Sequence, residues 1–495
     1  MSKSFLAVYR LDFVMMGSVL AKKSTFLWSV YVLFFCVYRN VNAIEGGAFA
    51  VAESSSKHAY ATMMYMGTPR DYEFYIAIRV MIRSLVKLKT NADLVVIASK
   101  DVPLDWGKTL CEDGARVVYV DNIDNPYKNQ SDFDRRFALS LNKLYAWSLV
   151  DYERVVMLDA DNVFLQKTDE LFLCGQFCAV FINPCILHTG LFVLQPSEKV
   201  FKHMLHQLAT GLKNEDGADQ GFVAAHFDDL LERPMFHPPT NGSKLNGFYR
   251  LPIGYQMDAS FYYLALKWDI PCGPNSVITF PSALWLKPWY WWAWPVLPLG
   301  LSWHTQRLET IGYDEEIPLA VAQSVFYIIT AIIAISIRQI FNTKPSSPNL
   351  CCLKSALGFS FYSVLLKKLI PFCIAASYLI PFFFVPKTIH PLMGWGLYLL
   401  GSMSLLIVIM NTFCIPVLAV ITIWIQVLGA LLVMAFPLYS NGMVRALSVG
   451  VYGFLAAPFL WRSGVKVMRH LDTCFEDDSL FSRFDHKQSR LSKLS

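Results

Sequence analysis

Hydrophobic positions divide the chain into two regions that differ in the length of their apolar runs. Between residues 60 and 268, short apolar runs alternate with longer segments whose apolar positions follow a helical spacing. Short runs of this kind are typical of buried strands in a parallel sheet. The alternation therefore predicts an α/β domain whose parallel sheet has helices on both faces. The expected strands are 61–66, 93–98, 116–120 and 154–158, and the expected helices are 74–88 and 137–150.

From Pro318 onward the apolar segments are much longer. Each approaches the ~20 residues that a helix needs to cross a bilayer. No Asp or Glu occurs between Glu316 and Asp472. Because charge is costly in hydrocarbon, this stretch is expected to be a membrane domain. Five spans are predicted, approximately 319–337, 369–385, 392–410, 415–436 and 444–461.

Basic residues indicate the orientation of these spans. They gather in the segment 338–368 and again after the fifth span, at Arg462 and Lys466, whereas only Lys387 lies between the second and third spans. The positive-inside rule then places the 338–368 loop and the C-terminal tail in the cytosol. The α/β domain is consequently expected in the lumen.

The N-terminal segment has the pattern of a secretory signal. Lys22 and Lys23 precede an apolar run over 26–37, and Val41-Asn42-Ala43 offers a cleavage site. The run is short for an anchor, and an uncleaved signal anchor is the alternative. Either reading agrees with a lumenal α/β domain.

One segment is unusually rich in tryptophan. Prolines interrupt it, so it does not have the pattern of a regular span. Tryptophan and tyrosine concentrate at membrane–water interfaces, so we expect the segment to hold the α/β domain against the bilayer, with an aromatic core patch as the alternative. Its tryptophans, six of the thirteen in the chain, are Trp285, Trp289, Trp291, Trp292, Trp294 and Trp303.

Composition agrees with a membrane protein and narrows the chemistry. Hydrophobic residues make up 54% of the chain and charged residues 16%, below the ~25% of ordinary soluble proteins. A net charge of +5 without a Lys/Arg-rich run gives no indication of a nucleic-acid partner. Cys174 and Cys178 have no Cys/His pair at zinc spacing after them, which leaves a disulfide or buried thiols.

Candidate chemistry begins with Asp159-Ala160-Asp161, which directly follows the predicted strand 154–158. In open α/β sheets, ligands bind outside the carboxyl ends of the strands. Two carboxylates placed there can hold a divalent cation and, through it, a diphosphate. A lone Asp-x-Asp is most often a solvated turn, so the surrounding motifs decide its meaning.

Four further motifs surround this pair in a fixed order. They are the segment 140–147 with Lys143, then His188-Thr189-Gly190, the segment 216–221, and 286–289 with Lys287. In this order and spacing they resemble the family 8 retaining glycosyltransferases, the glycogenin-like group, over about residues 60–290. The resemblance implies a single Rossmann-like nucleotide-sugar-binding domain of GT-A type, followed here by a multispan α-helical membrane domain.

The resemblance also implies roles around the donor, a UDP-sugar. Asp159 and Asp161, with Ala160 between them, would hold Mn²⁺ on its diphosphate. Lys143 and Lys287 would contact the donor, and Lys287 would reach the diphosphate.

Further residues would contact the nucleoside and the sugar. Met63, Tyr65 and Tyr72 would line the uridine pocket. Lys143, Asp219 and Gln220 would be the catalytic set. The sugar-side residues would be His188, Thr189, Gly190, Asp216, Asp219 and Gln220, with His188 and Thr189 standing where the family commonly has Asn-Ser.

The chain departs from the family at the third metal ligand. The family usually has a histidine six residues before the lysine that corresponds to Lys287, and here that residue is Pro281. His304 is a candidate replacement. Alternatively, water and the diphosphate complete the metal shell, and His304 is a structural or interfacial histidine.

Within the family, segments 254–260, 271–281 and 388–395 resemble the plant inositol phosphorylceramide glucuronosyltransferases. This implies transfer of glucuronic acid from UDP-glucuronate to an inositol phosphorylceramide lipid in the Golgi membrane. The glucuronate carboxylate would need a cation, and Arg135, Arg136 and Arg250 are candidates. The alternatives are a glycosyltransferase acting on a polysaccharide or protein, and a non-catalytic multispan scaffold.

The expected organisation has five parts. They are a signal peptide or anchor over 1–43, a lumenal catalytic domain over 44–283, a tryptophan-rich interface segment over 284–317, a multi-pass membrane domain over 318–465 and a cytosolic tail over 466–495.

Overall fold

The computed structural model of the chain describes residues 57–131, 133–182, 185–268, 275–280, 285–342, 360–413 and 415–491. The expected signal segment 1–43 and the position of Pro281 lie outside these ranges.

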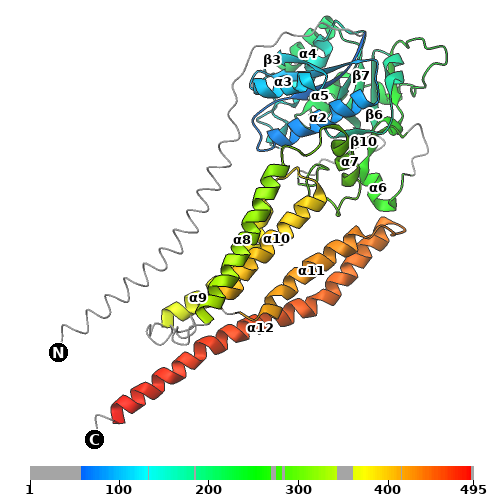
Figure 1. The fold of residues 1–495 in the computed structure, drawn as a ribbon. Coiled ribbons are helices and arrows are strands. Elements are labelled where there is room, and N and C mark those ends of the chain that lie inside the picture. The colour runs from blue at the N-terminus through cyan, green and yellow to red at the C-terminus, as the bar shows by residue number, and fades with distance from the viewer. Residues whose placement is uncertain are drawn as a thin grey trace. The chain divides into compact units, whose positions relative to one another are not determined.

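A seven-stranded sheet in the order β3-β2-β1-β4-β7-β6-β8 forms the centre of the α/β domain (Figure 1). The strands β3, β2, β1 and β4 are parallel, as the sequence predicts. β7 runs antiparallel to both β4 and β6, so the sheet is mixed and the fully parallel sheet was a wrong prediction. The reason is that β6 and β7 follow each other without a crossover helix, which parallel neighbours require. The strands are β1 His58–Met64, β2 Asp93–Ser99, β3 Ala115–Val120, β4 Arg154–Leu158, β6 Phe177–Phe181, β7 Leu187–Leu194 and β8 Phe248–Leu251.

A second, three-stranded sheet starts next to the paired aspartates. It has the order β5-β10-β9, with β5 Asn162–Phe164, β10 Val277–Thr279 and β9 Met257–Asp258. β5 begins one residue after Asp161, so the Asp-x-Asp turn connects the two sheets. Its backbone is therefore held at both ends by strand pairing.

Apolar side chains bury both faces of the large sheet. On one face, sheet residues pack against α4 Glu198–Thr210, α5 Asp219–His226 and the 3₁₀ helix η2 Ser140–Ser148. Trp147 of η2 is 1% exposed and stacks on Phe177 and Phe192. α2 Asp71–Lys87 packs against β1 and β5.

One predicted helix has a different form. Residues expected to make a single helix over 137–150 instead form η1 Arg135–Phe137 and η2, both of 3₁₀ type. Within η2, Asn142 Oδ1 accepts a hydrogen bond from the Ile123 amide at 2.9 Å, which attaches η2 to the segment after β3. Three further helices in this region are α3 Leu104–Glu112, α6 Ala259–Ala265 and α7 Gly300–Thr310.

All five predicted spans are helical. Of the described residues, four helices are long and apolar enough to cross a membrane, and the fifth, α9, has a shorter apolar stretch over Lys368–Phe384. The helices are α8 Ile317–Asn342, α9 Ser360–Phe384, α10 Pro391–Phe413, α11 Val417–Ala435 and α12 Gly442–Leu491.

The tryptophan-rich segment packs on protein rather than facing outward. Trp289, Trp291 and Trp303 are each at most 1% exposed, whereas Trp285 is 67% exposed. Trp291 packs edge-on against Trp395 of α10, with ring centroids 5.0 Å apart. The burial of these three rings agrees with the aromatic-core alternative, and contact of the segment with a membrane interface stays a prediction.

Polar contacts reinforce the same junction. The Trp291 amide donates to the Lys387 carbonyl at 3.1 Å, and the Lys387 ammonium pairs with buried Glu73 of α2 at 2.7 Å. Arg445 of α12 donates to the Val296 carbonyl at 3.0 Å. The α9–α10 loop is therefore bonded to α2, and α12 is bonded to the tryptophan-rich segment.

Gly394→Ala tests the tight packing of α10 on Trp291. A Cβ on Gly394 would lie 2.5 Å from the Trp291 ring, whereas a Cβ on Gly396 of the same helix meets nothing within 4 Å. We expect Gly394→Ala to destabilise the protein by about 1–3 kcal/mol through overpacking. The measurement is the thermal unfolding midpoint of the detergent-purified protein. Gly396→Ala is the matched control, and equal midpoints for both variants would contradict this packing.

Candidate active site

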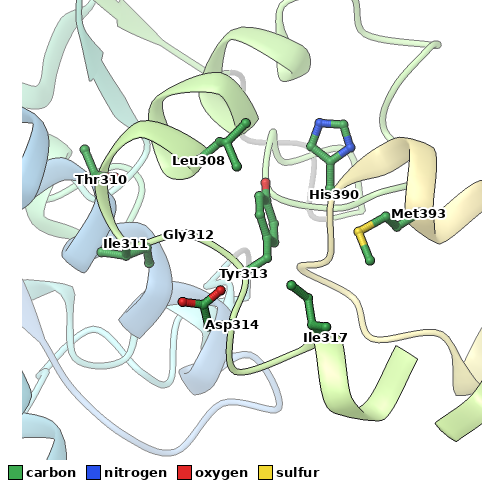
Figure 2. A pocket seen from close by; sticks show the side chains of 9 residues that line it. All are labelled: Leu308, Thr310, Ile311, Gly312, Tyr313, Asp314, Ile317, His390 and Met393. Atoms are coloured by element: carbon green, nitrogen blue, oxygen red, sulfur yellow. The ribbon is translucent and has the colours of Figure 1, made fainter. Parts of the chain in front are cut away.

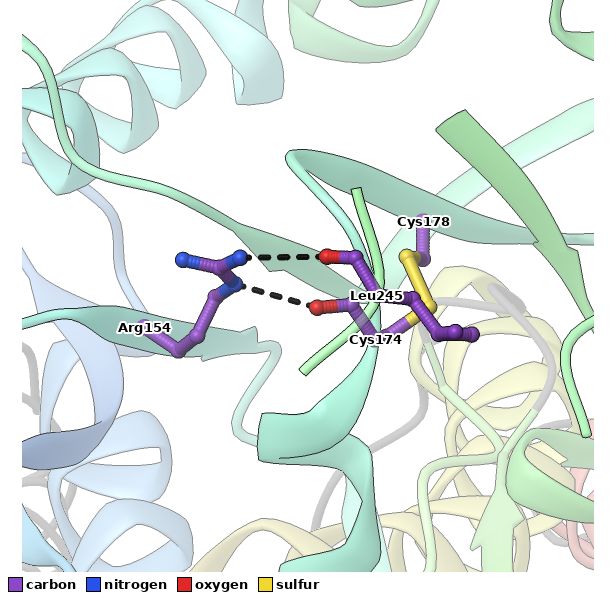
Figure 3. The surroundings of a disulfide bond; sticks show 4 residues. All are labelled: Arg154, Cys174, Cys178 and Leu245. Carbon is purple, nitrogen blue, oxygen red and sulfur yellow. Dashed lines mark hydrogen bonds between the residues drawn. A yellow bond between two sulfur atoms is a disulfide. The ribbon is translucent and has the colours of Figure 1, made fainter. Parts of the chain in front are cut away.

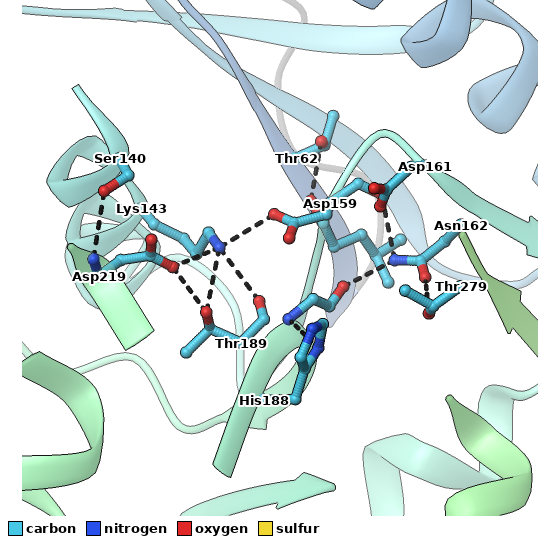
Figure 4. Close-up of polar contacts among 12 residues, drawn as sticks. Thr62, Ser140, Lys143, Asp159, Asp161, Asn162, His188, Thr189, Asp219 and Thr279 are labelled. Atoms are coloured by element: carbon cyan, nitrogen blue, oxygen red, sulfur yellow. Dashed lines mark hydrogen bonds and ion pairs between the residues drawn. The ribbon is translucent and has the colours of Figure 1, made fainter. Parts of the chain in front are cut away.

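A buried lysine joins four segments of the α/β domain. Lys143 lies on η2 and is 3% exposed. Its ammonium contacts Asp219 Oδ2 at 2.5 Å, Asp159 Oδ1 at 2.9 Å and the Thr189 carbonyl at 3.1 Å (Figure 4). Burial disfavours the charged ammonium, but the pairs with Asp159 and Asp219 outweigh it and raise the pKa of Lys143. The cluster therefore contains a permanent cation between two carboxylates.

Asp219 is fixed at the first turn of α5. Its Oδ2 accepts a second bond from the Thr189 hydroxyl at 2.7 Å, and its amide donates to Ser140 Oγ at 3.2 Å. Burial raises the pKa of the Asp219 carboxyl, but the Lys143 ammonium more than offsets this and lowers it below its usual value. Asp219 is therefore a carboxylate with a defined orientation.

The Asp159–Asp161 turn is positioned by two polar residues, Asn162 and Thr279. The Asn162 amide group donates to the carbonyls of Asp159 at 3.1 Å and Gly190 at 2.7 Å. The Thr279 hydroxyl of β10 in turn donates to Asn162 Oδ1 at 2.5 Å. The roles of Asn162 and Thr279 were not predicted, because they depend on a contact between residues 117 positions apart in the chain.

The Asp161 carboxylate is bonded to a lysine through one oxygen, and its other oxygen has no hydrogen-bond partner. The Lys287 ammonium bonds Asp161 Oδ2 at 2.6 Å, and Asp161 Oδ1 is buried without a hydrogen-bond partner. An unpartnered buried carboxylate oxygen is costly unless a cation occupies its vicinity. Carboxylate oxygens are suitable ligands for Mn²⁺ or Mg²⁺. The residues present therefore fit a divalent ion held by Asp159 and Asp161.

The structure does not bring His304 to this pair. His304 lies on α7, fully buried, with its Nδ1 2.6 Å from the Tyr313 hydroxyl and its ring against His390. In the part of the chain that the structure describes, no group of three His, Cys, Asp or Glu side chains is arranged to hold a metal. The Nε2 of His304 is buried without a hydrogen-bond partner, and its role as the third metal ligand stays a prediction.

His188 has a defined tautomer. Its Nδ1 lies 3.1 Å from the Gly190 amide and 2.5 Å from the side-chain nitrogen of Gln256. Because the backbone amide can only donate, Nδ1 is the acceptor and the ring proton of the neutral imidazole lies on Nε2. A Cβ at Gly190 would lie 2.3 Å from Gln256 Nε2, so only glycine fits between these side chains. Gln256 lies in segment 254–260, but the sequence analysis assigned it no role, because its contact with His188 joins residues 68 positions apart.

The residues expected around the nucleoside are spread over two places. Burial, followed by the nearby charges of Asp219 and Asp159, raises the pKa of Tyr65 to about 12, which puts Tyr65 beside the Lys143 cluster. Met63 packs against the domain core. Tyr72 is 39% exposed and donates to Glu315 Oε2 at 3.5 Å, so its hydroxyl is directed toward the segment that precedes α8.

Two of the sugar-side residues lie at the start of α5. The Asp216 carboxylate accepts from the amides of Ala218 at 2.8 Å and Gly221 at 3.1 Å, which shapes the turn that presents Asp219. Gln220 is half-buried one residue after Asp219. Asp216 therefore has a positioning role in the turn.

The three candidate cations for a carboxylated sugar lie outside the Lys143 cluster. Arg250 is on the edge strand β8 and donates to the Arg233 carbonyl at 2.8 Å. Arg136 pairs with Asp134 at 2.7 Å, and Arg135 is exposed.

A disulfide lies beneath strand β4. Cys174 and Cys178 are bonded, which decides between the two alternatives that the sequence left open (Figure 3). Arg154, the first residue of β4, donates to the carbonyls of Cys174 at 3.0 Å and Leu245 at 3.4 Å. The start of β4, the strand directly before Asp159, is thereby fixed to the disulfide loop.

The chain is similar to several known proteins. Residues 315–481 match the family described as the PGSIP7 C-terminal domain. "Putative glucuronosyltransferase PGSIP8" of Arabidopsis thaliana is 60% identical over 428 residues, covering 86% of this chain and 85% of that protein. "Inositol phosphorylceramide glucuronosyltransferase 1" of the same plant is 31% identical, covering 59% and 52%. Glycogenin-1 of Mus musculus is 32% identical, covering 29% and 44%.

These figures refine the resemblance inferred from the motifs. The chain is far more similar to PGSIP8 than to the inositol phosphorylceramide enzyme. The resemblance of segments 254–260, 271–281 and 388–395 had instead indicated the group of the latter enzyme.

Replacing Lys143 by Met should destabilise the domain strongly. The change leaves Asp159 and Asp219 without their shared cation, which costs about 3–5 kcal/mol for a buried pair. The measurement is the apparent melting temperature of the purified protein. Lys128→Met is the control, because that lysine forms an exposed pair with Asp124 that contributes at most about 1 kcal/mol. Adding Asp219→Asn to Lys143→Met should recover part of the loss. Equal melting temperatures for both lysine variants would show that the cluster is not a stabilising unit.

Proposed function

Because the chain belongs to glycosyltransferase family 8, the glycogenin-like group, we propose that it is a metal-dependent retaining glucuronosyltransferase. In this proposal it transfers glucuronic acid from UDP-glucuronate to inositol phosphorylceramide. The observation that carries it is the buried cluster of Lys143, Asp159 and Asp219 beside the Lys287–Asp161 pair. The names of PGSIP8 and of the inositol phosphorylceramide enzyme support the sugar.

Asp159 and Asp161 would hold the divalent ion, which when bound stabilises the charge that develops on the departing UDP. The unpartnered Oδ1 of Asp161 supports this assignment. Lys287, 2.6 Å from Asp161, adds a second positive charge where the diphosphate would lie. These positive charges accelerate the transfer because their attraction to the leaving group becomes stronger as the sugar–phosphate bond breaks.

Lys143 and its partners would orient the transferred sugar. Asp219 has a fixed carboxylate, so it accepts hydroxyl hydrogen bonds in one geometry. His188 presents an Nε2–H donor on the strand next to β4. A donor at this place suits a hydroxyl or carboxylate oxygen of the sugar.

A lipid acceptor is supported by the way the α/β domain meets the membrane helices. Trp291 is enclosed by α9 and α10, and the Lys387–Glu73 pair joins the α9–α10 loop to α2. A catalytic domain bonded directly to several apolar helices stays close to membrane lipids. The disulfide and the distribution of basic residues favour a lumenal domain, in keeping with a Golgi enzyme.

The direct test is a transfer assay with full-length protein in microsomes. UDP-glucuronate, UDP-glucose and UDP-galactose are each supplied with inositol phosphorylceramide or with an oligosaccharide acceptor. We expect glucuronate to appear on the lipid. Transfer to the oligosaccharide but not to the lipid would refute the acceptor, and use of UDP-glucose alone would refute the donor.

Asp159→Asn should lower the transfer rate by more than about 100-fold, because it removes a metal-binding charge next to the leaving group. It should also weaken Mn²⁺ binding, measured by electron paramagnetic resonance on the same protein without donor. Asp121→Asn is the matched control, since Asp121 is an exposed carboxylate of the same domain. Unchanged Mn²⁺ binding in Asp159→Asn would remove Asp159 from the metal site.

A further inference from the structure

The loop over residues 233–247 carries an N-glycosylation sequon, Asn241-Gly242-Ser243. This sequon loop joins the 3₁₀ helix η4 Leu230–Glu232 to β8, and all three residues of the sequon are exposed. Asn-x-Ser without proline at the middle position marks an acceptor asparagine in proteins of the secretory pathway. Such a short pattern also occurs by chance, so the structure around Asn241 decides whether a glycan fits there.

A turn presents the Asn241 side chain at the surface. The Gly242 amide donates to the Pro239 carbonyl at 3.1 Å, and Gly242 has a φ of +67°, which favours glycine. Asn241 Oδ1 accepts from the Ser243 amide at 3.1 Å and from the Ser243 hydroxyl at 2.7 Å. Both bonds use the side-chain oxygen, and the amide nitrogen that would carry a glycan takes no part in them. The turn can therefore keep its bonds when Asn241 is modified.

The second half of the sequon loop is bonded to the segment that contains the disulfide. The Leu245 amide donates to the Leu173 carbonyl at 2.9 Å, and Leu173 directly precedes the Cys174–Cys178 disulfide. Disulfides persist in oxidising compartments such as the lumen of the endoplasmic reticulum. N-glycosylated proteins pass through the same lumen. The disulfide and the sequon, which lie on neighbouring segments, therefore favour the same environment.

The sequon loop meets the sheet at the end opposite the candidate active site. β8, which follows the loop, is parallel to β6, and both β4 and β6 are antiparallel to β7. β4 and β8 therefore start at the same end of the sheet, where Arg154 donates to the Leu245 carbonyl at 3.4 Å. Asp159 follows the other end of β4, about 16 Å away at roughly 3.3 Å per residue. A glycan on this loop is consequently attached away from the residues expected to bind the donor.

The helices α8 and α10 begin at other residues. Figure 2 shows Ile317 at the start of α8 and His390 and Met393 at the start of α10, around a pocket of about 550 Å³. Among the described residues, none of the sequon loop lines this pocket. A glycan on Asn241 is therefore not attached at the residues from which these two helices would enter a bilayer.

The sequon Asn129-Gln130-Ser131 has a different position. Gln130 Nε2 donates to the Asn214 carbonyl at 3.4 Å, and a Cβ at Gly217 would lie 3.2 Å from Gln130 Oε1. Gly217 comes two residues before Asp219. A glycan on Asn129 would thus border the turn that presents Asp219. Because glycans are bulky, the two sequons differ in their consequences for the active site.

We propose that Asn241 is N-glycosylated. Its Nδ2 forms a bond to the anomeric carbon of an oligosaccharide that is supplied on a lipid diphosphate. The bond between that carbon and the diphosphate breaks, and one Nδ2 proton leaves with the released lipid diphosphate. The modification does not rest on the proposed glucuronosyltransferase activity, since it requires only that the sequon loop enters the lumen.

The test uses full-length protein expressed in plant cells with Asn129→Gln, so that Asn241 is in the one remaining sequon. Peptide N-glycosidase treatment should increase the electrophoretic mobility of this protein by one step. Asn241→Gln and Ser243→Ala should each abolish that step, whereas Ser243→Thr, which preserves the sequon, should retain it. Asn246→Gln is the matched control, because Asn246 is an exposed asparagine of the same loop outside any sequon.

Two results would overturn the proposal. One is an unchanged mobility of the Asn129→Gln protein after glycosidase treatment, and the other is a mobility step that persists in Asn241→Gln. Mass spectrometry gives the same decision for the position itself, because the glycosidase converts a glycosylated asparagine to aspartate. A protein that transfers glucuronate in the microsomal assay but has no glycan on Asn241 would overturn this proposal alone. A protein with the glycan but without transfer would overturn only the proposed function.

Discussion

The charge balance around Lys143 is the interaction on which the candidate active site depends. A single buried ammonium neutralises Asp159 from the end of β4 and Asp219 from the start of α5. Without it, two carboxylates would face each other in an environment of low polarity, and the segments that carry them would separate or take up protons. The lysine therefore sets both the geometry and the protonation of the cluster. The two carboxylates are therefore already oriented before a donor molecule binds.

Much of this arrangement follows from the sequence. The strand 154–158 has the predicted bounds, and Lys143, Asp159 and Asp219 come together as their motifs imply. Alternating apolar runs and ordered motifs are local features of the chain, so they can be recognised in a single sequence. The mixed half of the sheet was not predictable in this way, because strand direction depends on pairing across the fold.

Other features were hidden because they consist of contacts between distant segments. Thr279 supports Asn162 across two strands, and Gln256 reaches His188 across the site. The composition of the tryptophan-rich segment matched an interface equally well, and only the position of Gly394 opposite Trp291 shows that the ring is enclosed. The bond from His304 to Tyr313 was likewise hidden, because it joins the side chain of α7 to the loop that follows this helix.

The enclosure of Trp291 has a consequence for biosynthesis. Trp291 precedes its partners Phe382 and Trp395 by about a hundred positions in the chain. Since folding during synthesis proceeds from the N-terminus, the α/β domain is made while the surface that α9 and α10 will cover is still bare. That surface is apolar and open to wrong partners until the helices arrive. The docking of α9 and α10 thus follows the synthesis of the α/β domain, and a chain ending before α10 would leave part of that surface uncovered.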